Sequence, residues 1–70
     1  MSESISIVVN GEAREAALGV NVIQLLVALG IQGGRVAIER NMQILPRAAW
    51  AETPVVDGDR YEIVQFVGGG

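Results

Sequence analysis

Cysteine, histidine and lysine are all missing from this 70-residue sequence, and each absence narrows what the chain can do. Without cysteine there is neither a disulfide nor a thiolate zinc site, so the core must hold by packing alone. Without histidine the chain lacks the commonest general base and metal ligand. Its five basic residues are all arginines, and the net charge of -3 argues against sequence-independent binding of nucleic acid. We expect no metal site and no nucleic-acid partner.

Long apolar runs are missing as well. No stretch approaches the length of a membrane span, and Glu3 stands where a signal peptide would carry basic residues. We therefore expect a cytoplasmic protein without a membrane partner. A chain of this length buries only about 60% of the surface that its unfolded form exposes, which leaves no room for a deep active site.

A β-hairpin is predicted at the N-terminus. Residues 5–9 alternate as a half-buried strand does, and the pair Asn10-Gly11 tolerates the positive φ angles of a two-residue turn. Residues 12–16 should therefore return antiparallel to the first strand.

A single main helix is predicted to begin at Val22. Asn21 is a favourable N-cap, Gln24 completes a capping box, and Val20 before the cap can pack on Leu25. Gly30 suits a left-handed C-terminal cap, so the helix should end near Leu29. The apolar positions share one face, which we expect to cover a sheet: Val22, Leu25, Leu26 and Leu29.

The second half of the chain predicts three more strands, at residues 36–40, 43–45 and 61–67. Asn41 turns the chain between the first two, Pro46 ends the short one, and residues 48–52 form one helical turn that carries Trp50. Asp57 and Asp59 read as turn residues, because the other ligand positions of a calcium loop are missing.

Alternation divides the last strand between two faces, with Tyr61, Ile63 and Gln65 on one side and Glu62, Val64 and Phe66 on the other. Since charged Glu62 is unsuited to the core, Val64 and Phe66 should be exposed, and we expect them to form a docking surface. The order of elements predicts a two-layer α+β fold, with one main helix on one face of a mixed, four- to five-stranded sheet.

The sequence ends in three glycines, Gly68, Gly69 and Gly70, which offer no side chain to bury. We expect a folded domain at residues 1–67 and a flexible tail at residues 68–70. Extended, three residues reach about 10 Å, enough to place the terminal carboxylate in a narrow pocket of another protein. A carboxylate is a poor electrophile, so that partner would first activate it, as ATP-dependent adenylation does.

The whole chain resembles the ThiS family, the sulfur carriers of thiazole formation in thiamine biosynthesis, which have the ubiquitin-like β-grasp fold. The resemblance is carried by residues 8–12, residues 36–41, the Ile-Leu-Pro-Arg stretch at 44–47 with Trp50, the Asp-Gly-Asp-Arg stretch at 57–60, and the terminal Gly-Gly. It implies a carrier protein and not an enzyme.

The resemblance also implies the roles of individual residues. Gly70 would be adenylated by a ThiF-type enzyme with MgATP and become a thiocarboxylate, while Gly69 passes through the enzyme's channel and Gly68 lengthens the tail. No cofactor would be bound by the chain itself. A persulfide sulfur donor enzyme would supply the sulfur, and a ThiG-type thiazole synthase would accept it. Val64, Phe66 and Val67 are the candidate partner contacts.

Three alternatives remain open at this point. The small subunit of molybdopterin synthase is a β-grasp sulfur carrier with another acceptor. A ubiquitin-like modifier would join Gly70 to lysines of other proteins, and the absence of lysine here forbids only lysine-linked chains of the protein itself. A β-grasp binding module with a passive tail would lose nothing when Gly69 and Gly70 are removed.

Overall fold

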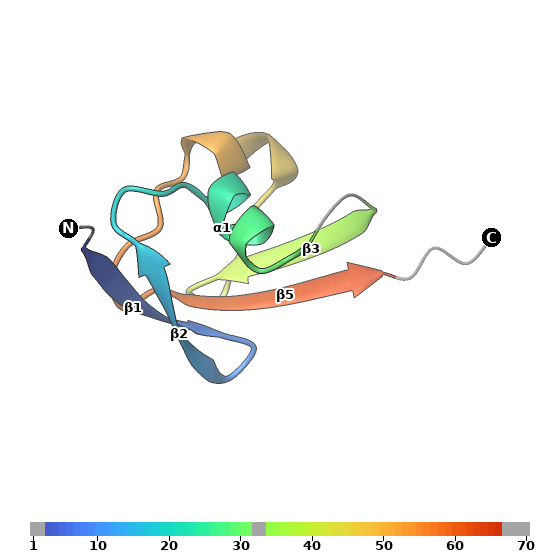
Figure 1. Cartoon of the computed structure of the whole chain (residues 1–70). Coiled ribbons are helices and arrows are strands. Elements are labelled where there is room, and N and C mark those ends of the chain that lie inside the picture. Colours follow the sequence, from blue (N-terminus) through green and yellow to red (C-terminus); the bar gives the residue numbers. More distant parts are fainter. Residues whose placement is uncertain (1–2, 32–33, 67–70) are drawn as a thin grey trace.

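The computed structural model describes residues 3–31 and 34–66 of the chain. Along the sequence the elements are β1 (Ser4–Val9), β2 (Glu12–Ala17), α1 (Val22–Ala28), β3 (Arg35–Arg40), β4 (Gln43–Ile44), the 3-10 helix η1 (Arg47–Glu52) and β5 (Arg60–Phe66). Figure 1 shows α1 and the 3-10 helix on the same side of the sheet, so the described residues form two layers.

The five strands lie in the order β2-β1-β5-β3-β4, with the first and last strands of the chain side by side in the middle. β1 and β5 run parallel, whereas the other neighbouring pairs are antiparallel. The sheet is therefore mixed, as expected, and one face remains open because α1 covers only the other.

Both hairpins turn through two residues of positive φ. Asn10 and Gly11 have φ angles of 50° and 82°, and they join β1 to β2 at the predicted position. Asn41 and Met42, at 51° and 71°, make the same kind of turn between β3 and β4.

The helix has the predicted caps at both ends. The side chain of Asn21 accepts from the backbone N–H of Gln24, whose side chain accepts in turn from the backbone of Asn21. At the other end Gly30 takes a φ of 79°, and the N–H of Ile31 donates to the carbonyl of Leu26. These bonds satisfy backbone groups that a seven-residue helix would otherwise leave unpaired.

The core lies between α1 and the inner face of the sheet. Ile5, Ile7 and Val9 of β1 point into it, as do Ile38 of β3 and Tyr61 and Ile63 of β5. The helix supplies Val22, Leu25 and Leu26, and Trp50 and Val55 close the side. Three of the four positions of the predicted helical stripe are thus buried, and Leu29 packs against the cluster from its border.

A few boundaries differ from the predicted ones. The last strand begins at Arg60, one residue before the predicted start, and its predicted end at Val67 lies outside the described residues. β4 holds only two residues because Leu45 leaves it, although the Leu45 N–H still donates to the Ile38 carbonyl. The helical turn around Trp50 is a 3-10 helix that already begins at Arg47. Gln65 is exposed although it alternates with Tyr61 and Ile63, since β5 runs past the core at this end.

Candidate functional site

The end of β5 that leads toward the C-terminus exposes apolar side chains on the open face of the sheet. Val64 and Phe66 are each 53% exposed, as the alternation of the strand predicted. Ala37 lies directly opposite Val64, and Ile44 of β4 extends the same face with 79% of its surface exposed. We name these four residues, Ala37, Ile44, Val64 and Phe66, the outer-face patch.

The outer-face patch is hollowed and has an acidic border. A depression of about 300 Å³ is lined by residues that include Ala37, Ile44 and Val64. Glu39 and Glu62 line it too, and the register places them directly opposite each other across β3 and β5. Like charges in such a pair are destabilising, and a cation from a partner would relieve their repulsion.

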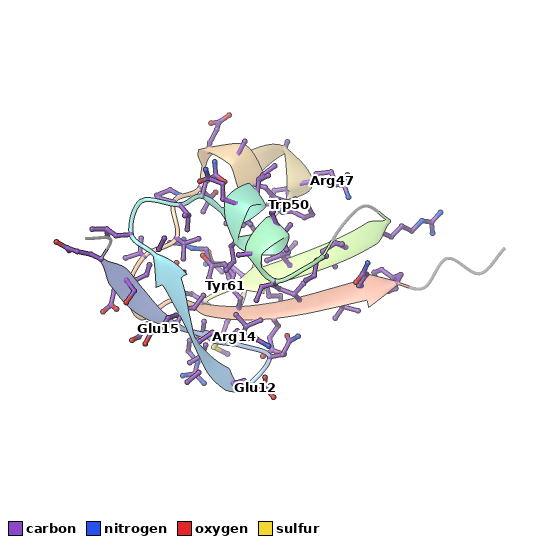
Figure 2. The ribbon with its side chains drawn as sticks, viewed as in Figure 1. Glu12, Arg14, Glu15, Arg47, Trp50 and Tyr61 are labelled. Carbon is purple, nitrogen blue, oxygen red and sulfur yellow. The ribbon has the colours of Figure 1, made fainter. Side chains whose placement is uncertain are left out.

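Arginines flank the other side of Phe66. The register pairs Phe66 with Arg35, and a wide groove of about 670 Å³ is lined by Phe66, Arg35 and Arg47 among others. The Arg47 guanidinium donates to the Gly34 carbonyl at 3.2 Å and lies 5.0 Å from the centre of the Trp50 ring. Arg47 and Trp50 lie close together in Figure 2, so the position of this cation is set by the buried tryptophan.

Trp50 itself has a structural role. It is buried, and its indole N–H donates to the Leu45 carbonyl at 3.0 Å. Trp50 therefore anchors the segment between β4 and β5 to the core.

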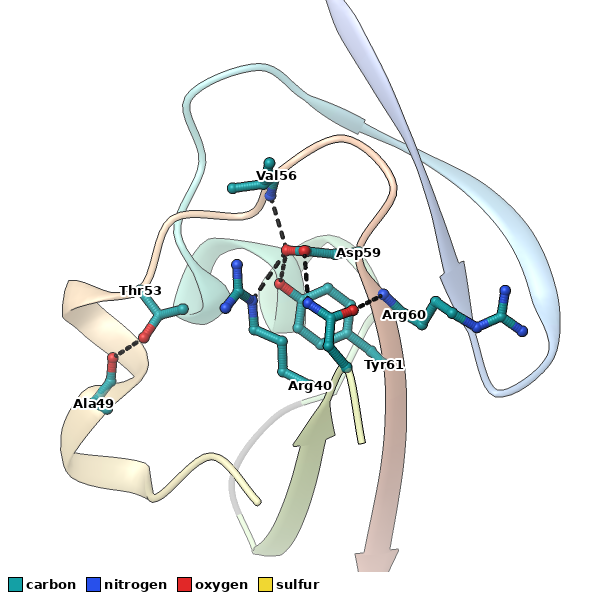
Figure 3. A network of polar contacts seen from close by, with 8 residues as sticks. Arg40, Ala49, Thr53, Val56, Asp59, Arg60 and Tyr61 are labelled. Carbon is teal, nitrogen blue, oxygen red and sulfur yellow. Dashed lines mark hydrogen bonds and ion pairs between the residues drawn. The ribbon is translucent and has the colours of Figure 1, made fainter. Parts of the chain in front are cut away.

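The opposite end of β5 is held by a polar cluster around Asp59 (Figure 3). One carboxylate oxygen of Asp59 accepts from the Tyr61 hydroxyl at 2.8 Å, the Val56 N–H at 2.9 Å and Arg40 Nε at 3.1 Å. The other accepts from the Asn41 side chain at 3.1 Å. Sequence reasoning treated Asp59 as a turn residue and missed this cluster, in which Asp59 is only 5% exposed.

The cluster shifts the pKa of its two acidic members, Asp59 and Tyr61. Burial alone would raise the pKa of Asp59, but the hydrogen bonds from Val56, Asn41, Tyr61 and Arg40 outweigh it and lower the pKa. Burial, together with the hydrogen bond to Asp59, raises the pKa of the Tyr61 hydroxyl to about 12. Asp59 is therefore an anchor that stays ionised, with all of its hydrogen bonds directed within the fold.

The remaining predicted site residues, Val67, Gly68, Gly69 and Gly70, lie outside the described residues, as does the predicted boundary between residues 1–67 and 68–70. Within the described part, the structure brings Val64 and Phe66 together on one exposed face. The partners that they gain across the sheet, Ala37 and Ile44, were not singled out from the sequence, because only the strand register reveals them.

Comparison with protein families gives a match to the ThiS family over residues 7–70. The chain belongs to the ThiS family. The matched segment includes the last residue, so the terminal glycines lie within it. Both the predicted membership in this sulfur carrier family of thiamine biosynthesis and the predicted ubiquitin-like β-grasp fold are confirmed.

Individual relatives agree with the family match. The sulfur carrier protein ThiS of Escherichia coli is 36% identical over 66 residues, which cover 94% of this chain and all of the relative. The crystal structure of the thiamine biosynthesis protein ThiS from Geobacter metallireducens superposes with a TM-score of 0.79 at 39% identity, and covers 94% of this chain and 100% of its own.

A third relative is much longer. The thiazole synthase of Paramagnetospirillum magneticum is 44% identical over 66 residues, or 94% of this chain, yet the match covers only 20% of that protein. The chain thus spans about a fifth of the length of this relative. Separately, none of the helices in residues 3–31 and 34–66 is long and apolar enough to cross a membrane.

Proposed function

We propose that the chain carries sulfur as a thiocarboxylate on Gly70 and delivers it to a thiazole synthase. The observation that carries the proposal is the joint position of two features: an exposed apolar patch on the last strand, and a family match that continues from this strand through residue 70. The outer-face patch would dock on a partner while the terminal carboxylate enters the partner's active site.

The energetics of binding to a partner require both the outer-face patch and the glycine tail. Ordering each tail residue costs about 1 to 2 kcal/mol of backbone entropy, and glycines bury no side chain to offset it. The free energy of association must come from a surface on the folded domain, and exposed Phe66, Val64 and Ile44 can supply it. Glycine in turn permits close approach of the backbone to the walls of a narrow channel.

The chemistry needs no catalytic side chain from this chain. A carboxylate oxygen of Gly70 attacks the α-phosphorus of MgATP in a ThiF-type enzyme, and pyrophosphate leaves. A persulfide from a donor enzyme then attacks the acyl carbon, and AMP leaves. Cleavage of the resulting acyl disulfide by a thiol gives the thiocarboxylate, and the second sulfur remains in a disulfide with that thiol.

The acceptor is the finer part of the proposal. In the thiazole synthase of Paramagnetospirillum magneticum a segment similar to this chain forms part of the same polypeptide. The thiazole synthase of Magnetococcus marinus contains such a segment as well, 36% identical over 61 residues. A carrier unit joined covalently to a synthase supports a thiazole synthase as the partner here, and the family match favours it over molybdopterin synthase.

The test is the intact mass of the protein after incubation with MgATP, a persulfide source and the ThiF-type enzyme of the same organism. We expect one oxygen to be replaced by sulfur, and fragmentation should place the change on Gly70. A variant without Gly69 and Gly70 is the control. It should remain unmodified and melt at the same temperature, because the core and the Asp59 cluster are built from residues 5–63.

Three results would contradict the proposal. An unmodified protein, with the enzyme shown to be active on another carrier, would make the glycines a passive tail. A thiocarboxylate that a thiazole synthase does not consume would establish the carrier but reject the acceptor. Gly70 joined to lysines of other proteins in cell extracts would identify a protein modifier instead.

A further inference from the structure

β2 forms an edge of the sheet, on the side away from the outer-face patch. The backbone of Ser6 bonds to residues 57 and 58, and the Val8 N–H donates to the Asp59 carbonyl. Amide groups alternate in direction along a strand, so Ile5, Ile7 and Val9 direct theirs toward β2. Their partners on β2 are Ala16, Arg14 and Glu12 respectively.

The intervening residues of β2 therefore point their backbone groups away from the sheet. The groups that point away are the N–H and C=O of Ala13, the N–H and C=O of Glu15, and the N–H of Ala17. The Ala17 carbonyl is already used, because it accepts from the Val20 N–H. No strand within residues 3–31 and 34–66 pairs with this side of β2. An unpaired edge of this kind is a template for another strand.

Beside the edge lies a groove whose lining is mainly apolar but also includes parts of Arg14, Glu15 and Gln24. The space between β2 and α1 measures about 360 Å³, and its lining includes Ala16, Val20, Leu25, Ala28 and Leu29. Small alanines on both the strand and the helix leave the floor of the groove open. A strand added to β2 would place every second side chain in this groove, which is the usual way in which an edge strand binds an extended peptide.

The charges of β2 show which strand would fit (Figure 2). Arg14 lies opposite buried Ile7 and therefore faces the helix side, where it lines the groove and contacts Glu12 at 3.5 Å. Glu15 lies opposite Ser6 and faces the open side. The edge thus presents a cation on one face and an anion on the other at successive positions.

A second copy of the chain does not meet this pattern. Antiparallel pairing of two β2 edges about a twofold axis places residues of the same face opposite each other, with hydrogen bonds made by Ala13, Glu15 and Ala17. Two such registers pair most of β2 with β2 of the second copy. One places Arg14 of one copy opposite Arg14 of the other, and the second places Glu15 opposite Glu15. Like charges directly opposite destabilise both.

We propose that the β2 edge binds an extended segment of another protein, which carries an acidic residue opposite Arg14, a basic residue opposite Glu15 and an aliphatic residue over Ala16. The segment would add a sixth strand to the sheet and fill the groove against Leu25 and Leu29. Because β1 lies between β2 and β5, the nearest strand of the outer-face patch, the β2 edge would remain accessible while the patch is occupied. The site does not depend on the sulfur chemistry proposed above.

The test uses the full chain labelled with ¹⁵N and a capped hexapeptide of sequence threonine-valine-lysine-glutamate-threonine-threonine, designed to pair antiparallel with β2. We expect amide shifts confined to β2 and to the facing side of α1. Exchange of the Ala13 and Glu15 amides with deuterium should slow in the complex, whereas the Arg14 amide, already directed at β1, should keep its rate.

The control peptide exchanges the lysine and the glutamate, so its composition is unchanged. It should bind about tenfold more weakly, because both charged pairs become repulsive. The double variant Arg14→Glu, Glu15→Arg should reverse this preference. Arg60→Glu, which changes an exposed arginine on β5, should leave it intact.

Equal binding of the two peptides, shifts centred on the outer-face patch, or no shifts at millimolar peptide would overturn the proposal. Concentration-dependent shifts in β2 of the free protein would do so too, by showing self-association.

Discussion

The two ends of β5 differ in how far their side chains are buried. At its beginning, Asp59, just before the strand, and Tyr61 within it are 5% and 1% exposed and are hydrogen-bonded to each other. Near its end, Val64 and Phe66 are each 53% exposed. The first end has its polar groups satisfied within the fold. The second offers apolar surface that no described part of the chain covers. One strand therefore joins an anchor to a surface suited to docking, and the two ends should respond to substitution in opposite ways.

The largest effect is expected from Asp59→Ala. The change leaves the donors of Arg40, Asn41 and Tyr61 without their shared acceptor, and removal of one partner from a buried ionic cluster costs about 3 kcal/mol or more. Urea denaturation at pH 7 measures the loss. Asp57→Ala is the matched control, because Asp57 accepts one bond, from the exposed Ser6 N–H, and should cost about 1 kcal/mol. Equal losses would show that Asp59 anchors nothing.

A smaller effect should appear at alkaline pH. The pKa of Tyr61 is about 12 in the folded protein, which lies above its value of about 10 in the unfolded chain. The contribution of this shift to the free energy of unfolding is therefore complete below pH 10 and is lost as the pH rises from about 10 to 12. The loss amounts to about 2 kcal/mol. With one tyrosine and no cysteine or lysine in the chain, Tyr61 is the only side chain with an ordinary pKa between 8 and 12.

Urea midpoints between pH 8 and 12 test this assignment, with Tyr61→Phe as the comparison. The variant should be less stable at pH 7, since Asp59 loses one donor, but its stability should stay level where that of the parent protein declines. Parallel declines in both proteins would place the alkaline transition outside the Asp59 cluster.

Local sequence was sufficient to predict the parts of the fold that depend on neighbouring residues. The turn at Asn10-Gly11 and the cap formed by Asn21 and Gln24 each involve residues within three positions of one another. Alternation along β5 also predicted which face would carry Val64 and Phe66. The family resemblance supplied the proposed roles of the glycines, which no periodicity could reveal.

Features made by distant segments were not predicted. The Asp59 cluster gathers Arg40 and Asn41 from the β3–β4 hairpin, and Ile44 joins the outer-face patch only because Glu39 lies opposite it. The groove beside β2 likewise requires the placement of α1 against an edge strand. Each depends on register and packing between elements, and a single sequence specifies these only through the complete fold.

The smallest change in stability, and the sharpest contrast with Asp59, is expected from Phe66→Ala. Half of the Phe66 surface already contacts solvent, so the free energy of unfolding should fall by at most about 1 kcal/mol. Binding to the proposed adenylating enzyme should weaken at least about tenfold, since aromatic side chains at the centre of an interface contribute most to affinity. Calorimetric titration with that enzyme and urea denaturation measure the two quantities on one sample.

The control variant is Leu18→Ala, which removes a side chain that is 59% exposed and lies outside the outer-face patch. It should change neither the stability nor the binding. If Phe66→Ala instead cost stability on the scale of Asp59→Ala and left binding intact, both ends of β5 would be structural, and the docking surface would have to lie elsewhere.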